Sequence, residues 1–334
     1  MKVAVIGLGS MGQRRIRLIK QYNETYEIFG IDTMEERCKD CREKLGIKTY
    51  PSISEMKQNE NVSCAFVCTS PLSHSAIIKD CLAHDLHVFT EINLIEDGYD
   101  ENIKTAKEKG LRLFLSSTFL YRDEVAYIKK ACRAAKDGKL NYIYHIGQYL
   151  PNWHPWEDYR KVFYANPRTN GCREIMAIDM PWILDIFGKV KNFTAMKSKN
   201  SDLDIEFNDN VYIMMEHENG NKGVFVCDVV TPKTERSFEV YGENFFLSWD
   251  GSATGIKEWR PDPTAENPNK VELHNVDIYG NSAENRNEYA AFVVENAYLN
   301  EIKAFFEYVN DGKTPVYTFE DDRDLLKMIG EIEK

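Results

Sequence analysis

Short apolar runs alternate with stretches of helical periodicity over the first 120 residues. The apolar runs have the length and composition of parallel strands that are buried on both faces. We place these strands at residues 2–6, 26–31, 63–68, 86–90 and 111–116. The stretches between them space their apolar residues as helices that pack on a sheet do, at residues 11–22, 34–45, 73–84 and 99–109. This alternation predicts an α/β domain with a doubly wound parallel sheet over residues 1–120.

The pattern changes beyond residue 120. A long helix is expected from Asp123 to Asp137, where Gly138 would end it. Polar and apolar residues then alternate, which is typical of strands with one buried face. These strands are predicted at residues 142–150, 190–197, 211–218, 223–230 and 237–241. The turn at Glu218–Asn221 predicts a hairpin between two of them.

Residues 121–315 therefore predict a second, α+β domain with a large and mostly antiparallel sheet. One face of this sheet is expected to be open, and such a face often joins subunits into a homo-oligomer, here a dimer or tetramer. The polar stretch 255–285 predicts a long excursion, and helical periodicity returns from 284 to 309. A last helix within residues 316–334 is expected to pack back on the first domain.

The first predicted strand leads directly into the turn Gly7-Leu8-Gly9-Ser10-Met11-Gly12. At this spacing the first glycine permits the tight turn, the second lets the backbone approach a pyrophosphate, and the third lets the helix pack closely on the strand. The phosphates then lie at the helix N-terminus, where free N–H groups and the helix dipole favour an anion. The turn predicts a Rossmann domain that binds a dinucleotide.

Asp32 ends the second predicted strand, 20 residues after Gly12, and indicates which dinucleotide is bound. A carboxylate at this place accepts hydrogen bonds from the ribose hydroxyls of NAD and would repel the 2′-phosphate of NADP. Arg14 and Arg15 leave NADP as an alternative, because either side chain would attract that phosphate. We expect NAD to be the cofactor.

The composition excludes several classes of protein. The 334 residues carry a formal net charge of -11, which argues against sequence-independent binding of nucleic acid. No apolar run of about 18 residues predicts a membrane span, and the N-terminal strand leaves no room for a signal peptide. We therefore expect a cytoplasmic protein whose eight cysteines are reduced. The histidines show no metal-ligand spacing, so no metal is expected.

The segment Pro151–Arg160 is the densest group of chemically useful side chains, with two tryptophans, a histidine, two acids, a tyrosine and an arginine. Indole rings suit the apolar faces of sugar rings, and an arginine can orient an anionic group. The imidazole of His154, with an unperturbed pKa of about 6.5, is suited to take the proton of a hydroxyl group. The alternative is that Trp153 and Trp156 are core residues and His154 is only hydrogen-bonded.

Two further motifs resemble the glucose–fructose oxidoreductase, inositol dehydrogenase and MocA family, the Gfo/Idh/MocA family. The run Thr69-Ser70-Pro71-Leu72-Ser73-His74 is similar to the Thr-Pro-x-x-x-His motif of that family, with a serine in place of its proline. Glu91-Ile92-Asn93 is similar to its Glu-Lys-Pro motif, with a match at the glutamate. The resemblance covers the layout of essentially the whole chain and implies that both loops border the cofactor. For His74 the alternative is a residue at a helix N-terminus without ligand contact.

The same resemblance implies an altered proton relay. Relatives carry a lysine where this chain has Ile92, and a histidine where it has Trp182. Asp179 lies one place from the acid that relatives carry on the same helix, and the alternative for Asp179 is a salt bridge with Arg173.

These features together predict an NAD-dependent oxidoreductase that transfers a hydride between nicotinamide and a hydroxyl or carbonyl group of a sugar, cyclitol or nucleotide-sugar derivative. The candidate catalytic residues are His154 and Asp179, and the candidate substrate-binding residues are Arg122, Trp153, Tyr159, Arg160 and Arg173. The candidate cofactor-binding residues are Gly7, Gly9, Ser10, Met11, Gly12, Asp32, Thr69, Ser70, His74, Glu91 and Asn93. One alternative is an enzyme that retains NAD and epimerises sugars or cleaves glycosidic bonds through transient oxidation. The other is a non-catalytic regulatory protein that binds NAD(H).

Overall fold

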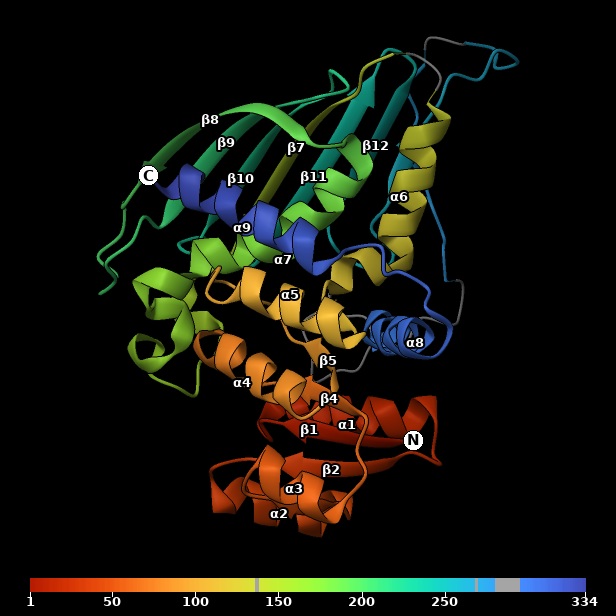
Figure 1. The fold of residues 1–334 in the computed structure, drawn as a ribbon. Coiled ribbons are helices and arrows are strands. Elements are labelled where there is room, and N and C mark those ends of the chain that lie inside the picture. The colour runs from red at the N-terminus through yellow and green to blue at the C-terminus, as the bar shows by residue number, and fades with distance from the viewer. Residues whose placement is uncertain (136–137, 268–269, 280–294) are drawn as a thin grey trace. The chain divides into compact units, whose positions relative to one another are not determined.

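The computed structural model describes residues 1–135, 138–267, 270–279 and 295–334. These residues belong to two compact units of the chain (Figure 1). Unit 1 contains Met1–Thr118 and Tyr298–Lys327, and unit 2 contains Phe119–Ala297 and Met328–Lys334. Two parts of predicted helices, 136–137 and 284–294, lie outside the described residues.

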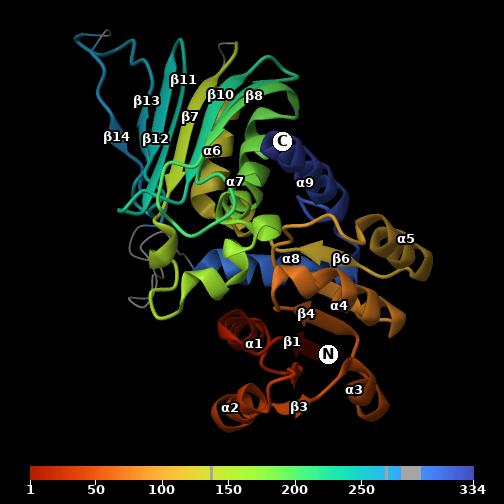
Figure 2. The ribbon, with the colours of Figure 1, turned by 90° about the vertical axis from the view of Figure 1, so that its left-hand side faces the viewer.

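Unit 1 is built on a six-stranded parallel sheet with the strand order β3-β2-β1-β4-β5-β6. The strands are β1 (Lys2–Ile6), β2 (Glu27–Ile31), β3 (Lys48–Tyr50), β4 (Cys64–Val67), β5 (His87–Thr90) and β6 (Leu113–Leu115). The helices that alternate with them are α1 (Ser10–Tyr22), α2 (Glu35–Leu45), α3 (Ile53–Asn59), α4 (Pro71–Ala83) and α5 (Tyr99–Lys109). Figure 2 shows α1 and α2 on one face of this sheet and α4 and α5 on the other. The predicted doubly wound α/β fold is confirmed.

The sequence pattern missed β3 and α3, which lie at one edge of the sheet. The three residues of β3 include none that is fully buried, so no apolar run marks the strand. For α3 a signal was present: the hydroxyl of Ser52 accepts a hydrogen bond from the backbone N–H of Glu55 at 3.2 Å. A serine followed three residues later by a glutamate is a typical helix start.

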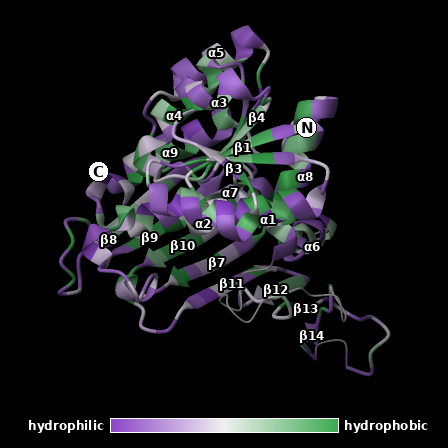
Figure 3. Cartoon of the chain, turned by 90° about the horizontal axis from the view of Figure 1, so that it is seen from below, coloured by the Kyte–Doolittle hydropathy of each residue, from purple (hydrophilic) through white to green (hydrophobic). Residues whose placement is uncertain are grey.

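The core of unit 1 surrounds its central strands. Val3, Ala4 and Val5 of β1 are completely buried, as expected for a strand covered on both faces. In Figure 3 the strands near β1 are largely green, the colour of hydrophobic residues, whereas much of α5 is purple.

Helix α8 (Glu295–Asp311) contributes aromatic side chains to this core. The ring of Phe305 lies edge-on against Phe66 and Phe89, with centroid distances of 5.2 and 5.7 Å. The sequence pattern had predicted that the chain returns to the first domain at residue 316. Because α8 packs in this core, the chain returns to unit 1 earlier, at Tyr298. The last helix, α9, extends from Phe319 to Glu333.

Unit 2 contains an eight-stranded sheet among its described residues, with the order β14-β13-β12-β11-β7-β10-β9-β8. Every adjacent pair is antiparallel except β7 and β10, which run parallel. The strands are β7 (Asn141–Gly147), β8 (Val190–Ser198), β9 (Asn210–His217), β10 (Lys222–Asp228), β11 (Glu235–Gly242), β12 (Phe245–Trp249), β13 (Lys257–Trp259) and β14 (His274–Asn275). The mostly antiparallel sheet is confirmed, and so is the hairpin between β9 and β10. The expected excursion over 255–285 instead contains two short strands, β13 and β14, which extend the sheet edge.

Two helices, α6 (Asp123–Ala134) and α7 (Gly171–Phe187), lie along one face of this sheet (Figure 2). Between β7 and α7 the chain forms four short 3₁₀ turns, η2 (Leu150–Asn152), η3 (Tyr159–Lys161), η4 (Phe163–Ala165) and η5 (Pro167–Thr169). A fifth such turn, η1 (Thr118–Tyr121), precedes α6. The aromatic segment singled out in the sequence therefore lies in a series of tight turns that leads into α7.

All eight cysteines are free thiols, as expected. None of the helices in the described part of the chain combines the length and the apolar character that crossing a membrane requires.

A buried group of charges joins α1, the loop after β5 and α8 within unit 1. Arg15 is completely buried and donates to both carboxylate oxygens of Glu91, at 2.6 and 3.0 Å, and to Glu301 at 3.0 Å. Glu301 in turn accepts the backbone N–H of Ser117 at 2.6 Å. Burial alone would lower the pKa of Arg15, but the two carboxylates raise it above its usual value and keep the guanidinium charged. Arg15 is thus the cation that two buried acids depend on.

We predict that Arg15→Met lowers the free energy of unfolding by about 3–5 kcal/mol, because it leaves two carboxylates buried without their cation. Urea denaturation followed by circular dichroism measures this loss. The matched control is Lys39→Met, at an exposed lysine of α2, which we expect to change stability by less than about 0.5 kcal/mol. Equal stability of the two variants would contradict the structural role of Arg15.

Candidate functional site

The glycine turn between β1 and α1 has the geometry of a phosphate-binding loop. Gly7 has a φ of +90°, and a Cβ on it would lie 2.7 Å from the carbonyl oxygen of Cys68. A Cβ on Gly12 would lie 1.9 Å from the carbonyl oxygen of Gly7, so the helix packs on the turn without room for a side chain. At Gly9, the N-cap of α1, a Cβ would have the Arg37 guanidinium at 3.9 Å as its only neighbour within 4 Å among the described residues. A side chain there would not disturb the fold but would occupy the approach to the helix N-terminus formed by Ser10 and Met11.

Asp32 lies beside this turn at the end of β2. One of its carboxylate oxygens accepts the backbone N–H of Leu8 at 2.8 Å, and the other accepts that of Met34 at 2.8 Å. Each oxygen retains a lone pair for a ribose hydroxyl. The guanidinium of Arg37 lies 3.7 Å from Asp32 and is half exposed.

Arg14 and Arg15, the two arginines that left NADP as an alternative, contact other residues of unit 1. Arg15 is buried between its acids, and the guanidinium of Arg14 lies 4.9 Å from the ring centroid of Tyr298. The arginine that does lie beside Asp32 is Arg37, which sequence reasoning missed. Its signal was its place in the first turns of the helix that follows Asp32.

The loop after β4, the second loop predicted to border the cofactor, is held by a chain of buried hydrogen bonds. His74 is 2% exposed, and its ring nitrogens bond to Asn93 Oδ1 at 2.8 Å and to the carbonyl oxygen of Thr69 at 2.9 Å. Burial lowers the pKa of His74 below its usual value. Both of its nitrogens are engaged, so His74 fixes the conformation of the loop at Thr69, and Ser70 is exposed as the N-cap of α4.

This chain of bonds extends away from the loop. Asn93 donates to the hydroxyl of Tyr99 at 2.7 Å, and that hydroxyl donates to Asp322 of α9. Tyr317 donates to the other oxygen of Asp322 at 3.1 Å. Burial raises the pKa of Asp322 to about 7. Glu91, the remaining predicted residue of this region, accepts hydrogen bonds from Nε and one terminal nitrogen of Arg15, and its side chain is 12% exposed. Asp322 and its partners are distant in sequence, and no motif pointed to them.

Four polar atoms of unit 2 lie buried without a hydrogen-bond partner among the described residues. They are Nδ1 of His154, the hydroxyl of Tyr164, Oε2 of Glu174 and Oδ2 of Asp179. Tyr164 is 1% exposed, and its ring lies 5.6 Å from the His154 ring in an edge-to-face arrangement. Tyr164 belongs to η4, which packs against α7, the helix that carries Glu174.

Burial and neighbouring charges perturb these groups. Burial raises the pKa of Glu174 to about 8. Burial, with the charges of Glu157 and Glu174, raises the pKa of Tyr164 to about 12. Buried carboxyl groups with raised pKa values are typical of sites that exchange protons. Sequence reasoning missed both Tyr164 and Glu174, because nothing local distinguishes them from ordinary residues of a turn and a helix.

The aromatic residues of the loop surround this cluster. Trp153 donates through its indole N–H to the carbonyl oxygen of Gln148 at 3.1 Å, and its ring lies 5.1 Å from that of Tyr164. Trp156 is 75% exposed and stacks on His154 at 5.3 Å. Trp156 is thus no core residue, whereas Trp153 is partly buried and hydrogen-bonded as the packing alternative predicts.

The predicted substrate-binding arginines are each paired with an acid of unit 2. Arg122 is buried against Glu124 at 2.6 Å, Arg160 forms two bonds with Asp158 at 2.8 and 2.9 Å, and Arg173 pairs with Glu333 at 2.6 Å. Tyr159 accepts a hydrogen bond from the backbone N–H of Asp204 at 3.1 Å. Each of these side chains therefore already has a partner within unit 2.

Asp179 is 1% exposed and has a different environment from His154. One carboxylate oxygen accepts hydrogen bonds from the hydroxyl of Tyr144 at 2.6 Å, from the indole of Trp182 at 3.2 Å and from Arg236. Its salt-bridge partner is Arg236, so the alternative that it pairs with Arg173 is wrong. The geometry gives Asp179 the role of holding Arg236 and Trp182 in place.

Comparisons with known proteins match the N-terminal part and the following part of the chain to two separate family models. Residues 1–117 match the family model "Oxidoreductase family, NAD-binding Rossmann fold" of the Gfo/Idh/MocA family, and residues 128–247 match the model of its C-terminal domain. The chain therefore belongs to the Gfo/Idh/MocA family, and its N-terminal domain is an NAD-binding Rossmann domain. A curated relative, myo-inositol 2-dehydrogenase of Thermotoga maritima, is 28% identical over 144 residues. This match spans 42% of the chain and 42% of the relative.

Solved structures share the fold over almost the whole chain. The WlbA dehydrogenase of Bordetella pertussis, in complex with NADH and UDP-GlcNAcA, has a TM-score of 0.78 at 16% identity and covers 99% of this chain and 94% of its own. The UDP-N-acetylglucosamine 3-dehydrogenase GnnA of Acidithiobacillus ferrooxidans has a TM-score of 0.75 at 16% identity, covering 100% and 96%. At this identity the likeness shows the fold alone.

The three glycines of the turn predict a pair of contrasting variants. Gly9→Ala is expected to unfold at the same urea concentration as the wild type, because the added methyl group has room in the fold. It is expected to bind NADH at least tenfold more weakly, because the methyl group occupies the space through which the pyrophosphate approaches the helix. Gly12→Ala is expected to lose several kcal/mol of stability, because its methyl group overlaps the Gly7 carbonyl. Urea denaturation and titration of NADH fluorescence measure both effects. Wild-type affinity in folded Gly9→Ala would rule out the turn as the phosphate site.

Proposed function

We propose that this protein is an NAD-dependent oxidoreductase that acts on a hydroxyl or carbonyl group of a sugar, cyclitol or nucleotide-sugar derivative. The observation that carries the proposal is the glycine turn with Asp32 beside it, in a chain of an oxidoreductase family. The similarity to an inositol dehydrogenase and to nucleotide-sugar dehydrogenases supports the substrate class.

The residues of unit 1 fit the cofactor. The bare Gly9 leaves the N-terminus of α1 open for the pyrophosphate, and Asp32 has lone pairs for the ribose hydroxyls. Thr69 and Asn93 lie on the loops that His74 fixes at the carboxyl edge of the sheet, where open α/β folds bind ligands. NAD supplies hydride acceptance and donation when it is bound, and the protein supplies orientation and the transfer of the hydroxyl proton.

Two measurements on one preparation test this proposal. NADH binding is followed by nicotinamide fluorescence, and turnover by absorbance on neutral sugars, cyclitols and nucleotide sugars. We expect NAD to be preferred over NADP, and Asp32→Ala to reduce that preference by at least tenfold, because it removes the carboxylate that repels a 2′-phosphate.

The competing functions give other results. Cofactor that stays bound through purification, with sugar conversion but no net NADH, would indicate the NAD-retaining epimerase or glycosidase. NADH binding without turnover on any sugar would indicate the regulatory protein. An unchanged cofactor preference in Asp32→Ala would contradict the assignment of NAD to this residue.

We further propose that the open face of the sheet in unit 2 joins two copies of this chain. Ile143, Met196, Tyr212, Met214 and Tyr241 are 41–70% exposed. The strand register places Ile143 and Met214 on either side of Val224, and Tyr212 opposite Met196. A row of apolar side chains on an exposed sheet face marks an interaction surface.

Light scattering on the purified protein checks this arrangement. We expect a dimer or larger homo-oligomer for the wild type, and a smaller species for Met214→Glu, because a charge in the row opposes its burial. The matched control is Glu206→Met, at an exposed acid outside the sheet, which should not change the mass. A monomeric wild type would refute the proposal.

A further inference from the structure

A line of buried side chains connects the loop at Thr69 with helix α9. Its members are His74, Asn93, Tyr99 and Asp322, which all belong to unit 1 and are 1–5% exposed. The line begins at the carbonyl oxygen of Thr69, which lies 2.9 Å from His74 Nε2. It continues from His74 Nδ1 to Asn93 at 2.8 Å and from Asn93 to Tyr99 at 2.7 Å, and it ends where Tyr99 meets the Asp322 carboxylate.

The four contacts of this hydrogen-bond line need four hydrogen atoms. A neutral imidazole carries one N–H, and the Tyr99 hydroxyl carries one O–H. The amide group of Asn93 can present its N–H to one of its two neighbours and its oxygen to the other. An ionised carboxylate supplies no hydrogen. With a neutral His74 and an ionised Asp322, one contact would therefore join two acceptors.

The neighbouring hydroxyl groups do not supply the missing hydrogen. Thr90 Oγ1 lies 3.3 Å from His74 Nδ1 and donates to the carbonyl oxygen of Glu91 at 3.1 Å. Tyr317 donates to the other oxygen of Asp322, also at 3.1 Å. Both hydrogens are used beside the line and not within it. The line needs one further proton, on His74 or on Asp322.

Two arrangements of the line hold this proton. In the first, His74 is an imidazolium that donates at both nitrogens, and every donor points toward an ionised Asp322. In the second, a protonated Asp322 donates to Tyr99, the amide group of Asn93 is turned over, and a neutral His74 donates only to Thr69. Both arrangements contain the same number of protons. Burial opposes the two charges of the first, because it lowers the pKa of His74 and raises that of Asp322 to about 7.

The far end of the line lies at the glycine turn. A Cβ on Gly7 would be 2.9 Å from Cγ2 of Thr69 and 2.7 Å from the carbonyl oxygen of Cys68, so the loop at Thr69 packs on that turn. His74 holds this loop through the carbonyl oxygen of Thr69. Loss of the proton leaves two acceptors in contact and weakens the hold on Thr69.

We propose that His74 and Asp322 share one proton through Asn93 and Tyr99, and that Asp322 is thereby a positioning residue for the loop at Thr69. The effect on the cofactor rests on the proposed function, whereas the shared proton rests on the geometry of unit 1. Two groups that share a proton titrate as a pair, and this pair loses its proton as the pH rises through about 7.

Other titratable groups face the two ends of the line. Tyr317 and Asp321 lie beside Asp322, and Glu96 acts on Tyr99. Glu91 lies beside His74, and its charge is matched by Arg15.

Asp322→Asn tests the shared proton because an asparagine supplies the missing hydrogen permanently. Its amide N–H can donate to Tyr99 while its oxygen accepts from Tyr317. In the wild type, burial raises the pKa of Asp322 from 3.8 to about 7, so the stability that its proton provides is lost as the pH rises between these values. Above pH 7 we therefore expect Asp322→Asn to unfold at a higher urea concentration than the wild type. Lower stability of this variant at every pH would overturn the shared proton.

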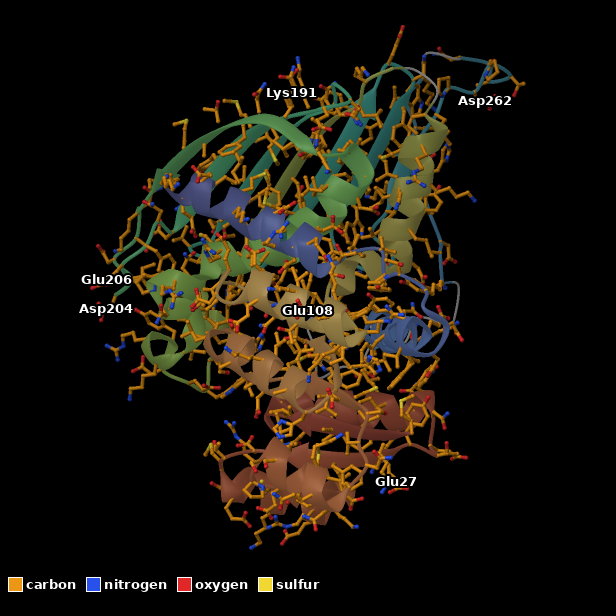
Figure 4. The ribbon with its side chains drawn as sticks, viewed as in Figure 1. Glu27, Glu108, Lys191, Asp204, Glu206 and Asp262 are labelled. Carbon is orange, nitrogen blue, oxygen red and sulfur yellow. The ribbon has the colours of Figure 1, made fainter. Side chains whose placement is uncertain are left out.

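The matched control is Glu108→Gln, which also removes one negative charge. Glu108 is an exposed acid of α5, the helix that carries Tyr99, and Figure 4 labels it. We expect this variant to keep the wild-type dependence of stability on pH.

NADH binding measures the effect on the loop. We expect the Kd of the wild type and of Glu108→Gln to rise about tenfold as the pH passes through 7, the effect of about one hydrogen bond. The Kd of Asp322→Asn should stay constant over the same range. An equal rise in Asp322→Asn, or a constant Kd in the wild type, would overturn the positioning role.

Nitrogen NMR of the His74 ring gives a readout that a merely structural role would not move. The full chain is labelled with ¹⁵N-histidine, and His74→Gln identifies the ring signals. We expect these signals to change in one step near pH 7 in the wild type and to stay those of a neutral ring in Asp322→Asn. The same step in both proteins, or no step in the wild type, would overturn the shared proton. A wild type that does not bind NADH would count against the proposed function, and the urea and NMR measurements would still decide the shared proton.

Discussion

The contact between Gly12 and the carbonyl oxygen of Gly7 is the constraint on which the nucleotide end of the chain depends. It allows α1 to start directly at the end of β1, with no side chain between helix and turn. The N-terminus of α1 is thereby fixed beside Asp32, whose carboxylate holds the turn through the N–H of Leu8. The close approach of Gly12 to Gly7 thus positions two groups. They are the backbone N–H groups that can bind a pyrophosphate and the acid that can bind a ribose.

Buried charge is treated differently in the two functional regions. In unit 1 the acids near the cofactor loops have partners: Glu91 and Glu301 hold Arg15, and Asp322 accepts two tyrosine hydroxyls. In unit 2 Arg160 and Arg173 are paired with acids, while Glu174 and Asp179 each have one oxygen without a hydrogen-bond partner among the residues described. A hydrogen-bond network in which every group has a partner makes a site rigid. A network with an unpaired buried group is less stable, and a hydrogen bond from a ligand would remove that loss of stability.

Sequence reasoning succeeded where the chemistry is local. The apolar runs predicted the central strands, and Asp32 does lie beside the glycine turn, because strand, turn and helix follow one another in the chain. It missed β3 at one edge of the first sheet and β13 and β14 at one end of the second, because these strands are short and exposed, and it also missed β12. It also assigned arginines such as Arg173 to the substrate, because the acid that neutralises this one, Glu333, lies 160 residues away.

The sequence by itself determined the family, the two-domain plan and the cofactor, since each rests on short motifs whose residues are neighbours in the chain. Only the tertiary structure decided which of the polar side chains are already satisfied. It paired Arg160 and Arg173, buried Asp179 against Arg236, and left Tyr164 and Glu174 unpartnered within the described chain. Whether a polar group is available to a substrate depends on partners brought together by folding, and no local pattern records them.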